Sequence, residues 1–143
     1  MRAIVYDGNE PAVRTDVEVR DPGPTDVAVR IVNAGVCHSD LSVLDGSIPF
    51  PTPLVMGHEG AGVVEAVGSE VSKLKVGDHV VLSPLKYCGQ CSACNTGFPT
   101  RCRRSFGVMS QPFTVGGEPA YNFAATSVFT DVTVVDQVQA VKV

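Results

Sequence analysis

The chain has 143 residues, of which 44% are hydrophobic and 18% charged, and its formal net charge is −4. This length suits one domain with its own core, and no apolar run approaches the roughly 20 residues that cross a bilayer. Lys and Arg are scattered, which argues against a nucleic-acid surface because that needs a basic stripe. The one local cluster, Arg101, Arg103 and Arg104, is interpreted as a solvated loop.

Short runs rich in Val and Ile alternate with turn signals along the chain, and each run predicts a strand. In chain order the predicted strands are 2–6, 13–20, 27–32, 62–67, 78–82 and 128–135. The segments between them contain turn-forming Pro and Gly, as in DPGPTD and IPFPTP. The pattern predicts a mainly β fold with short helices (α+β), built as a partly closed β-barrel.

Two short helices are predicted among the strands. One starts near Ser39, whose hydroxyl can cap it, and ends at Gly46; the other starts near Gly89. The glycine-rich GHEGAG at 57–62 has the wrong spacing for a GxGxxG turn, and no acidic partner follows a βαβ unit. We therefore expect that a dinucleotide-binding Rossmann domain is absent from this chain.

Five cysteines are present, and the opening MRAIVYDGNE lacks the apolar core of an export signal. The expected location is therefore cytoplasmic, where thiols stay reduced, so a disulfide framework is a poor explanation of the cysteines.

Four of the cysteines lie close together in the sequence. Cys88, Cys91, Cys94 and Cys102 have gaps of two, two and seven residues. Such spacing lets four thiolates surround one Zn²⁺ as a closed, structural site. A redox CxxC pair would leave two thiols unexplained, and an iron–sulfur cluster is not excluded by the spacing. We expect a structural zinc that organises a lobe at about 85–105, which is too poor in hydrophobic residues to fold by packing.

A second group of potential ligands lies outside that lobe. Cys37 occurs in GVCHSD and His58 in GHEG. From residue type alone, Cys37 is more often a small buried hydrophobe and His58 a satisfied polar residue. Neither residue by itself indicates a metal.

The sequence resembles the zinc-dependent alcohol dehydrogenases of the medium-chain dehydrogenase/reductase family. The resemblance lies in GVCHSD at 35–40, GHEGAGVVEAVG at 57–68, KVGDHV at 75–80 and the four-cysteine lobe. The late segment 113–143 resembles the liver-type and glutathione-dependent formaldehyde dehydrogenase branch. The resemblance implies a GroES-like catalytic domain over 1–143, with the NAD(P)-binding domain outside this chain.

The resemblance also implies a catalytic zinc held by Cys37, His58 and a third ligand that has no counterpart here. It implies that Ser39 hydrogen-bonds the alcohol and takes its proton, and that Asp40 orients His58; both residue types suit these roles. Glu59 matches a glutamate beside the metal, although pairing with a nearby arginine is the alternative.

Several further positions follow from the same resemblance. His38 stands where relatives place a basic residue facing the cofactor pyrophosphate, but it could simply be exposed. Ser42 stands where some relatives have a relay histidine, so proton release would run through water or another group. Pro84, Leu85 and the loop 48–53 either line the substrate pocket or serve as turn and core residues.

The predicted function is therefore that of the zinc-binding catalytic domain of an NAD(P)-dependent alcohol dehydrogenase, inactive without its partner domain. The full enzyme is expected to oxidise a small alcohol to an aldehyde or ketone, as a homodimer or homotetramer. The zinc-free quinone-reductase branch should lack the cysteine lobe. A stand-alone zinc-stabilised barrel with a binding or scaffolding role is the alternative. Continuation of the chain into a GxGxxG unit would distinguish the dehydrogenase from this barrel.

Overall fold

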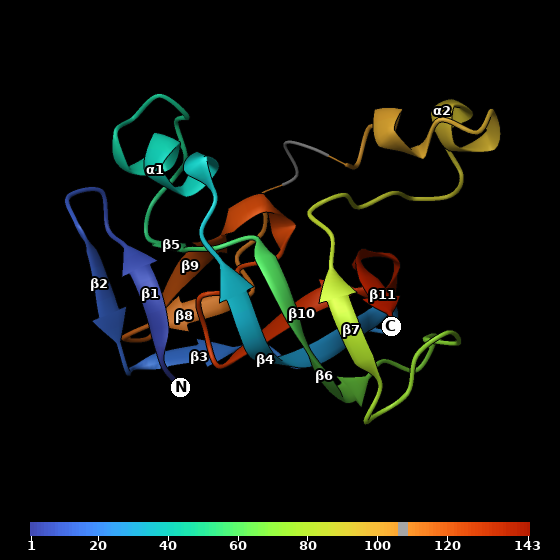
Figure 1. The fold of residues 1–143 in the computed structure, drawn as a ribbon, viewed down its shortest axis with the longest axis horizontal. Coiled ribbons are helices and arrows are strands. Elements are labelled where there is room, and N and C mark those ends of the chain that lie inside the picture. Colours follow the sequence, from blue (N-terminus) through green and yellow to red (C-terminus); the bar gives the residue numbers. More distant parts are fainter. Residues whose placement is uncertain (106–108) are drawn as a thin grey trace.

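Two curled sheets form the body of the molecule in the computed structural model, which describes residues 1–105 and 109–143 (Figure 1). The first sheet has the order β2-β1-β5-β9-β8-β3. Its strands are β1 Ala3–Tyr6, β2 Pro11–Arg14, β3 Val17–Val19, β5 Leu54–Val55, β8 Phe113–Val115 and β9 Glu118–Asn122. The second sheet has the order β10-β4-β6-β7-β11. Its strands are β4 Asp26–Gly35, β6 Glu59–Val67, β7 His79–Leu82, β10 Val132–Asp136 and β11 Ala140–Lys142.

Short helices connect or extend these sheets. They are α1 His38–Leu44, α2 Ser92–Asn95, and the 3-10 turns η1 Pro99–Arg101, η2 Phe123–Ala125 and η3 Gln137–Gln139. Figure 1 shows α2 and η1 on an arm that stands apart from both sheets. Among the described strands only β5 and β9 pair in parallel, so this is no doubly wound sheet. The prediction of a mainly β, partly closed barrel is confirmed.

The core consists largely of valines that point inward from facing strands. In β4, Val27 lies opposite Val135 of β10, and Val29 lies opposite Val64 of β6. All four side chains are buried in one cluster that Leu74 and Val80 extend. A second buried cluster lies on the first sheet and includes Val5, Val17, Val55, Phe113 and Val115. Since each buried side chain of this size contributes about 1.5–3 kcal/mol, these clusters supply most of the stability of the fold.

The predicted strands 27–32 and 62–67 were too short, and two others, 13–20 and 128–135, were too long. The run 13–20 is interrupted by a bend at Thr15 and Asp16, so β2 pairs with β1 while β3 pairs with β8. The backbone N–H of Gly116 donates to the Asp16 carbonyl and fixes this break. In the run 128–135 the strand begins only at Val132, because the residues before it bond to the β5–β6 connection instead.

Helix starts also differ from the predictions. The cap of α1 is Cys37 and not Ser39, which lies inside the first turn. Asp40 supports this start, because its Oδ2 accepts from the Cys37 backbone N–H at 2.9 Å. The second helix begins at Ser92, because Gly89 takes a left-handed turn with φ 70°.

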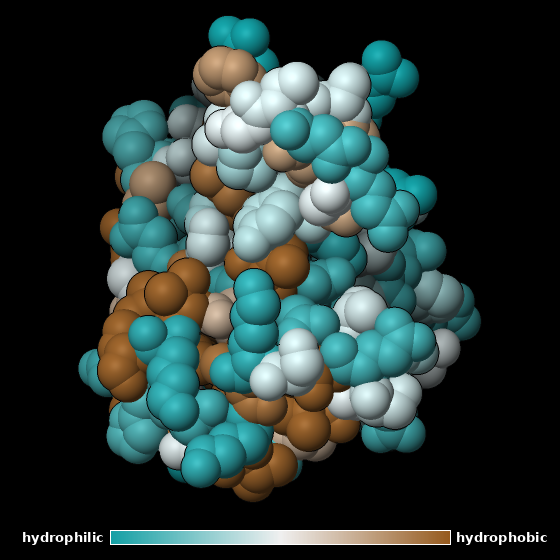
Figure 2. All heavy atoms as spheres, turned by 90° about the vertical axis from the view of Figure 1, so that its right-hand side faces the viewer, coloured by the Kyte–Doolittle hydropathy of each residue, from teal (hydrophilic) through white to brown (hydrophobic). Residues whose placement is uncertain are grey.

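The outer face of the second sheet keeps apolar side chains at the surface. Val81 of β7 pairs with Val141 of β11, and they are 45% and 54% exposed. Figure 2 shows this side of the molecule, where apolar patches lie between polar side chains. In the described part of the chain, no helix has the length and apolarity needed to cross a membrane.

An ion pair fastens the last strand to the rest of the second sheet. Lys142 Nζ donates to the buried Asp78 Oδ1 at 2.7 Å, and the backbone N–H of Lys75 donates to Asp78 Oδ2. The hydrogen bond from Lys142 is the main reason that the pKa of Asp78 lies below its usual value. A depressed pKa stabilises the fold above the unfolded value of about 4, and this contribution is lost as pH falls through the folded value.

We therefore expect Asp78→Asn to lower the thermal unfolding midpoint at pH 7 and to flatten its decline with acid below about pH 4. The measurement is the unfolding midpoint of both proteins between pH 2 and pH 7. Glu118→Gln is the control, since Glu118 is exposed and forms no ion pair within the described ranges. Parallel pH profiles for Asp78→Asn and the parent chain would contradict the prediction.

Candidate metal centres

Four cysteines meet in the arm that carries α2 and η1. Cys88 and Cys91 precede α2, Cys94 lies within it, and Cys102 follows η1. One ligand atom from each of the four lies within 4.8 Å of the others. Cys102 is buried and the other three are half-buried. Sequence spacing predicted this convergence, and the geometry suits a tetrahedral site with no open position.

The backbone around these sulfurs is arranged to offset negative charge. The N–H groups of Cys88 and Arg104 donate to the Cys102 sulfur at 3.3 and 3.4 Å. Backbone donation from Cys94 lowers the pKa of Cys91 to about 6, whereas burial raises the pKa of Cys94 to about 11. Four thiolates this close repel one another, so all four ionise together only around a cation. The donor set therefore fits a soft, divalent metal such as zinc.

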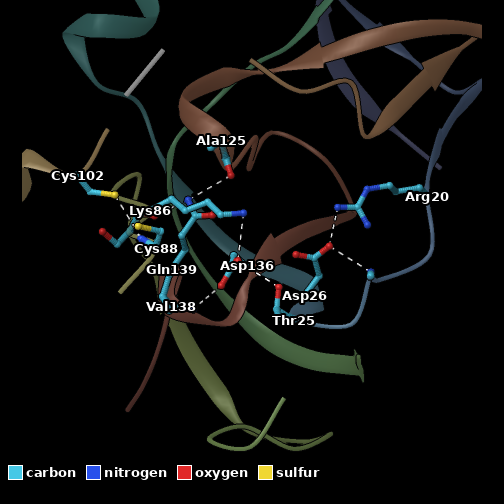
Figure 3. Close-up of polar contacts among 12 residues, drawn as sticks. Arg20, Thr25, Asp26, Lys86, Cys88, Cys102, Ala125, Asp136, Val138 and Gln139 are labelled. Carbon is cyan, nitrogen blue, oxygen red and sulfur yellow. Dashed lines mark hydrogen bonds and ion pairs between the residues drawn. The ribbon is translucent and has the colours of Figure 1, made fainter. Parts of the chain in front are cut away.

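Little apart from these sulfurs organises the arm. No residue from 88 to 101 is buried, so hydrophobic packing cannot hold it. Its base is fastened by Lys86, whose Nζ lies 3.1 Å from Asp136 Oδ2 (Figure 3). The sequence prediction of a lobe that cannot fold by packing alone agrees with this burial pattern.

A second group of potential ligands lies where β4 and β6 meet. In their antiparallel register Gly35 lies opposite Glu59. Cys37 follows just after the end of β4 and His58 comes just before β6, so both lie at the same end of this strand pair. One ligand atom each from Cys37, His58 and Glu59 lies within 4.8 Å of the others. The structure thus brings together the two residues that composition alone left unconnected.

His58 and Asp40 form a buried pair behind this group. Their side chains are 11% and 4% exposed, and His58 Nδ1 lies 3.6 Å from Asp40 Oδ1. That distance is too long for a hydrogen bond, and neither atom has a partner among the described residues. Leaving such groups unpaired costs about 1–3 kcal/mol each. Phe123 packs edge-on against the imidazole with ring centres 4.9 Å apart.

The remaining predicted site residues lie around Cys37 and His58. Ser39 lies 3.6 Å from the Cys37 sulfur, Oγ to Sγ, and its side chain reaches the pocket described below. Glu59 is exposed and forms no ion pair within residues 1–105 and 109–143, so the alternative of pairing with an arginine is not observed. His38 is exposed, and its Nδ1 lies 3.3 Å from the Ser42 hydroxyl.

A pocket of about 370 Å³ opens beside His58 and Ser39. Of the residues predicted to line it, Pro84 does so, as do Ile48 and Phe50 of the loop 48–53. Leu85 and the rest of that loop do not. The opposite wall was not predicted from the sequence and consists of Met109 and the segment Asn122, Phe123, Ala124 and Ala125. The only sequence signal for that wall is an aromatic residue followed by small ones, which is common in ordinary turns.

Comparison with known proteins places this fold and site in context. The domain family described as "Alcohol dehydrogenase GroES-like domain" matches residues 23–143. Alcohol dehydrogenase class-3 of Drosophila melanogaster is 35% identical over 99% of this chain and 40% of its own length. An alcohol dehydrogenase zinc-binding domain protein from Burkholderia ambifaria superimposes with a TM-score of 0.90 at 38% identity, covering 99% of this chain and 41% of that one.

Benzyl alcohol dehydrogenase from Acinetobacter calcoaceticus is similar as well, with a TM-score of 0.87 at 37% identity over 99% of this chain and 40% of that chain. The chain described here belongs to the alcohol dehydrogenase family and has its GroES-like domain. The family prediction is confirmed, and the class-3 relative supports the predicted branch. The chain spans about 40% of the length of the class-3 alcohol dehydrogenases that it matches.

The cysteine lobe predicts one firmly bound zinc whose removal disorders the arm and spares the barrel. We expect Cys94→Ser, or a strong chelator, to remove that zinc and to expose Arg101 and Arg103 to rapid cleavage by trypsin. Elemental analysis and the rate of cleavage are the measurements, and Ser92→Ala in the same helix is the control. Iron in place of zinc would indicate a cluster, and an unchanged cleavage rate would show that no metal holds the arm.

Proposed function

We propose that this chain is the metal-binding, substrate-side domain of a zinc-dependent alcohol dehydrogenase. The observation that carries this proposal is that Cys37 lies against His58, which together with Ser39 lines a largely apolar pocket. In the proposal a structural zinc occupies the cysteine lobe, and a catalytic zinc lies between Cys37 and His58. The reaction is oxidation of a small alcohol to an aldehyde or ketone, with hydride transfer to NAD(P) bound outside this domain.

The unpaired atoms of Asp40 and His58 support a metal at the second site. With Nδ1 directed at the Asp40 carboxylate, Nε2 is the imidazole nitrogen left for a metal. A small shift of the ring would turn the 3.6 Å separation into a hydrogen bond and satisfy both buried atoms. Zinc, when bound there, supplies Lewis acidity toward the alcohol oxygen.

Glu59 is the residue that we propose as the third ligand within this chain. Its carboxylate lies within the same 4.8 Å group as the Cys37 sulfur and a His58 nitrogen. It also lies over Gly35, where a side chain would approach Glu59 Oε2 to 2.9 Å. The third ligand predicted from family resemblance was a residue absent from the chain, so Glu59 would act as its substitute.

The chain's own residues would divide the remaining work. Ser39 holds a hydroxyl at the pocket beside His58, in position to hydrogen-bond the alcohol and accept its proton. Asp40 would fix the tautomer and orientation of His58 from behind once its carboxylate accepts a hydrogen bond from Nδ1. His38 is exposed on the first turn of α1, where it is available to a cofactor phosphate. The homodimer or homotetramer expected for the complete enzyme remains a prediction.

The pocket wall suggests the class of substrate. Ile48, Phe50, Met109 and Phe123 give it an apolar lining, and about 370 Å³ is at the small end of ligand pockets. An aromatic primary alcohol fits these limits, because its ring would lie against the phenylalanines and its hydroxyl beside Ser39. A benzyl alcohol dehydrogenase is among the similar structures, which supports the same class.

The test is the number of zinc ions per chain in the purified, reduced protein. We expect about two, and we expect Cys37→Ser to lower the count to about one without loss of folding. Cobalt substitution checks the site itself, since a Cys37 thiolate on Co²⁺ gives a charge-transfer band that benzyl alcohol should perturb. A count of one that Cys37→Ser leaves unchanged would contradict the proposed catalytic site.

A further inference from the structure

One wall of the pocket has an unusual backbone. Ala124, Ala125 and Ser127 all have positive φ, at 50°, 57° and 49°. Side chains with a Cβ rarely adopt this left-handed region, and three within four residues need external support. Ala124 and Ala125 line the pocket directly, so whatever holds this backbone also holds the wall.

Buried polar side chains provide that support from within the fold. Ser127 Oγ accepts from the Phe123 backbone N–H at 2.8 Å and donates to the Val55 carbonyl at 2.7 Å. Thr133 Oγ1 of β10 donates to the Thr126 carbonyl. These bonds fix both ends of the left-handed stretch, but they leave the Ala125 carbonyl in the middle to another partner.

Gln139 is that partner, and it connects two walls of the pocket. Its Nε2 donates to the Ala125 carbonyl at 3.3 Å and to the Ser83 carbonyl at 3.2 Å, and Figure 3 shows the reach to Ala125. Ser83 immediately precedes Pro84, which lines the pocket from another side. The backbone N–H of Ser83 also donates to the Gln139 carbonyl at 2.8 Å.

The side chain of Gln139 is itself outside the pocket. The residue is 1% exposed and borders a separate polar cavity of about 130 Å³ on the far side of Ala125. One amide group therefore sets the distance between the Ala125 backbone and the Ser83 backbone. A side chain of equal length without two N–H donors would release at least one of them.

We propose that Gln139 is a positioning residue that determines which alcohols the pocket accepts, by holding these two walls at a fixed separation. This inference rests on the proposed function, since it takes the pocket as the substrate pocket. Gln139 touches no substrate and acts through the backbone of Ala125 and of Ser83. Loss of the two bonds would let the walls separate and favour bulkier alcohols.

The test variant is Gln139→Met, which keeps the length of the side chain and removes both donors. Gln137→Met is the matched control, because Gln137 lies in the same 3-10 turn but bonds Ser72 and Glu70 away from the pocket. We would measure the dissociation constants of two alcohols by ¹⁹F NMR on the zinc-loaded chain. The smaller is 4-fluorobenzyl alcohol and the larger is (4′-fluorobiphenyl-4-yl)methanol. We expect Gln139→Met to shift their ratio about fivefold toward the larger alcohol, and Gln137→Met to leave it within about twofold.

Two further variants separate positioning from simple loss of stability. Thr133→Val removes another support of the same wall and should shift the ratio in the same direction, even if Gln139→Met folds poorly. Val17→Ala destabilises the other core cluster, which contains no residue of this wall, and should leave the ratio unchanged. Equal effects on the ratio from Val17→Ala and Gln139→Met, or no effect from Gln139→Met, would overturn the positioning role.

A readout that needs no substrate keeps this inference distinct from the proposed function. In ¹H–¹⁵N spectra we expect the amide signals of Ala125, Thr126 and Ser83 to move together in Gln139→Met and to stay in place in Gln137→Met. If those signals move while neither alcohol binds the parent chain, the substrate assignment of the pocket fails. If they do not move, Gln139 does not position the walls.

Discussion

The pairing of β4 with β6 is the constraint on which the candidate catalytic site depends. The two strands approach so closely that a Cβ on Gly62 would lie 2.2 Å from the Arg30 carbonyl oxygen, so glycine is required there. Bulges after Ala28 and after Ile31 add twist to the pair. The register that results puts Cys37 and His58 at one end of this strand pair, although 20 residues lie between them in the sequence. A slip of one residue would turn each side chain to the opposite face.

The two metal centres depend on different parts of the molecule. Cys37 and His58 lie at one end of β4 and β6, in a sheet whose core contains Val27, Val29 and the residues packed against them. The geometry of this site is therefore set by the folding of the sheet. The arm from 88 to 101 has no buried residue, so its geometry would be set by the metal. On our proposal that zinc occupies both centres, its loss would leave the sheet around Cys37 and His58 intact but would disorder the arm.

Local patterns explain what could be predicted from the sequence. The four lobe cysteines span 15 residues, so their spacing alone predicts that they converge. The alternation of Val27, Val29 and Ile31 likewise predicts a strand with one buried face, although Asp26 and Ala28 on the other face are buried too. The strands β5, β8, β9 and β11 were not predicted, because each contains at most one Val or Ile and so lacks the run that marked the others. The wall at Ala124 and Ala125 was not predicted because its conformation is set by Gln139 and Thr133, which lie outside the segment and have no turn signature.

The buried polar side chains around the pocket fall into two sets: those that hold its wall by hydrogen bonds and those that have an unpaired atom. Ser127 and Thr133, which hold the pocket wall, make buried hydrogen bonds, and those of Gln139 are partly buried. Within the described residues, the buried side-chain atoms without a partner are Asp40 Oδ1, His58 Nδ1 and Ser105 Oγ, and all three residues lie at or directly behind the pocket. Unpaired buried groups cost free energy, so a fold keeps them where another interaction compensates. A metal on His58 would supply that compensation by drawing the imidazole onto Asp40, which links the stability of the site to its occupation.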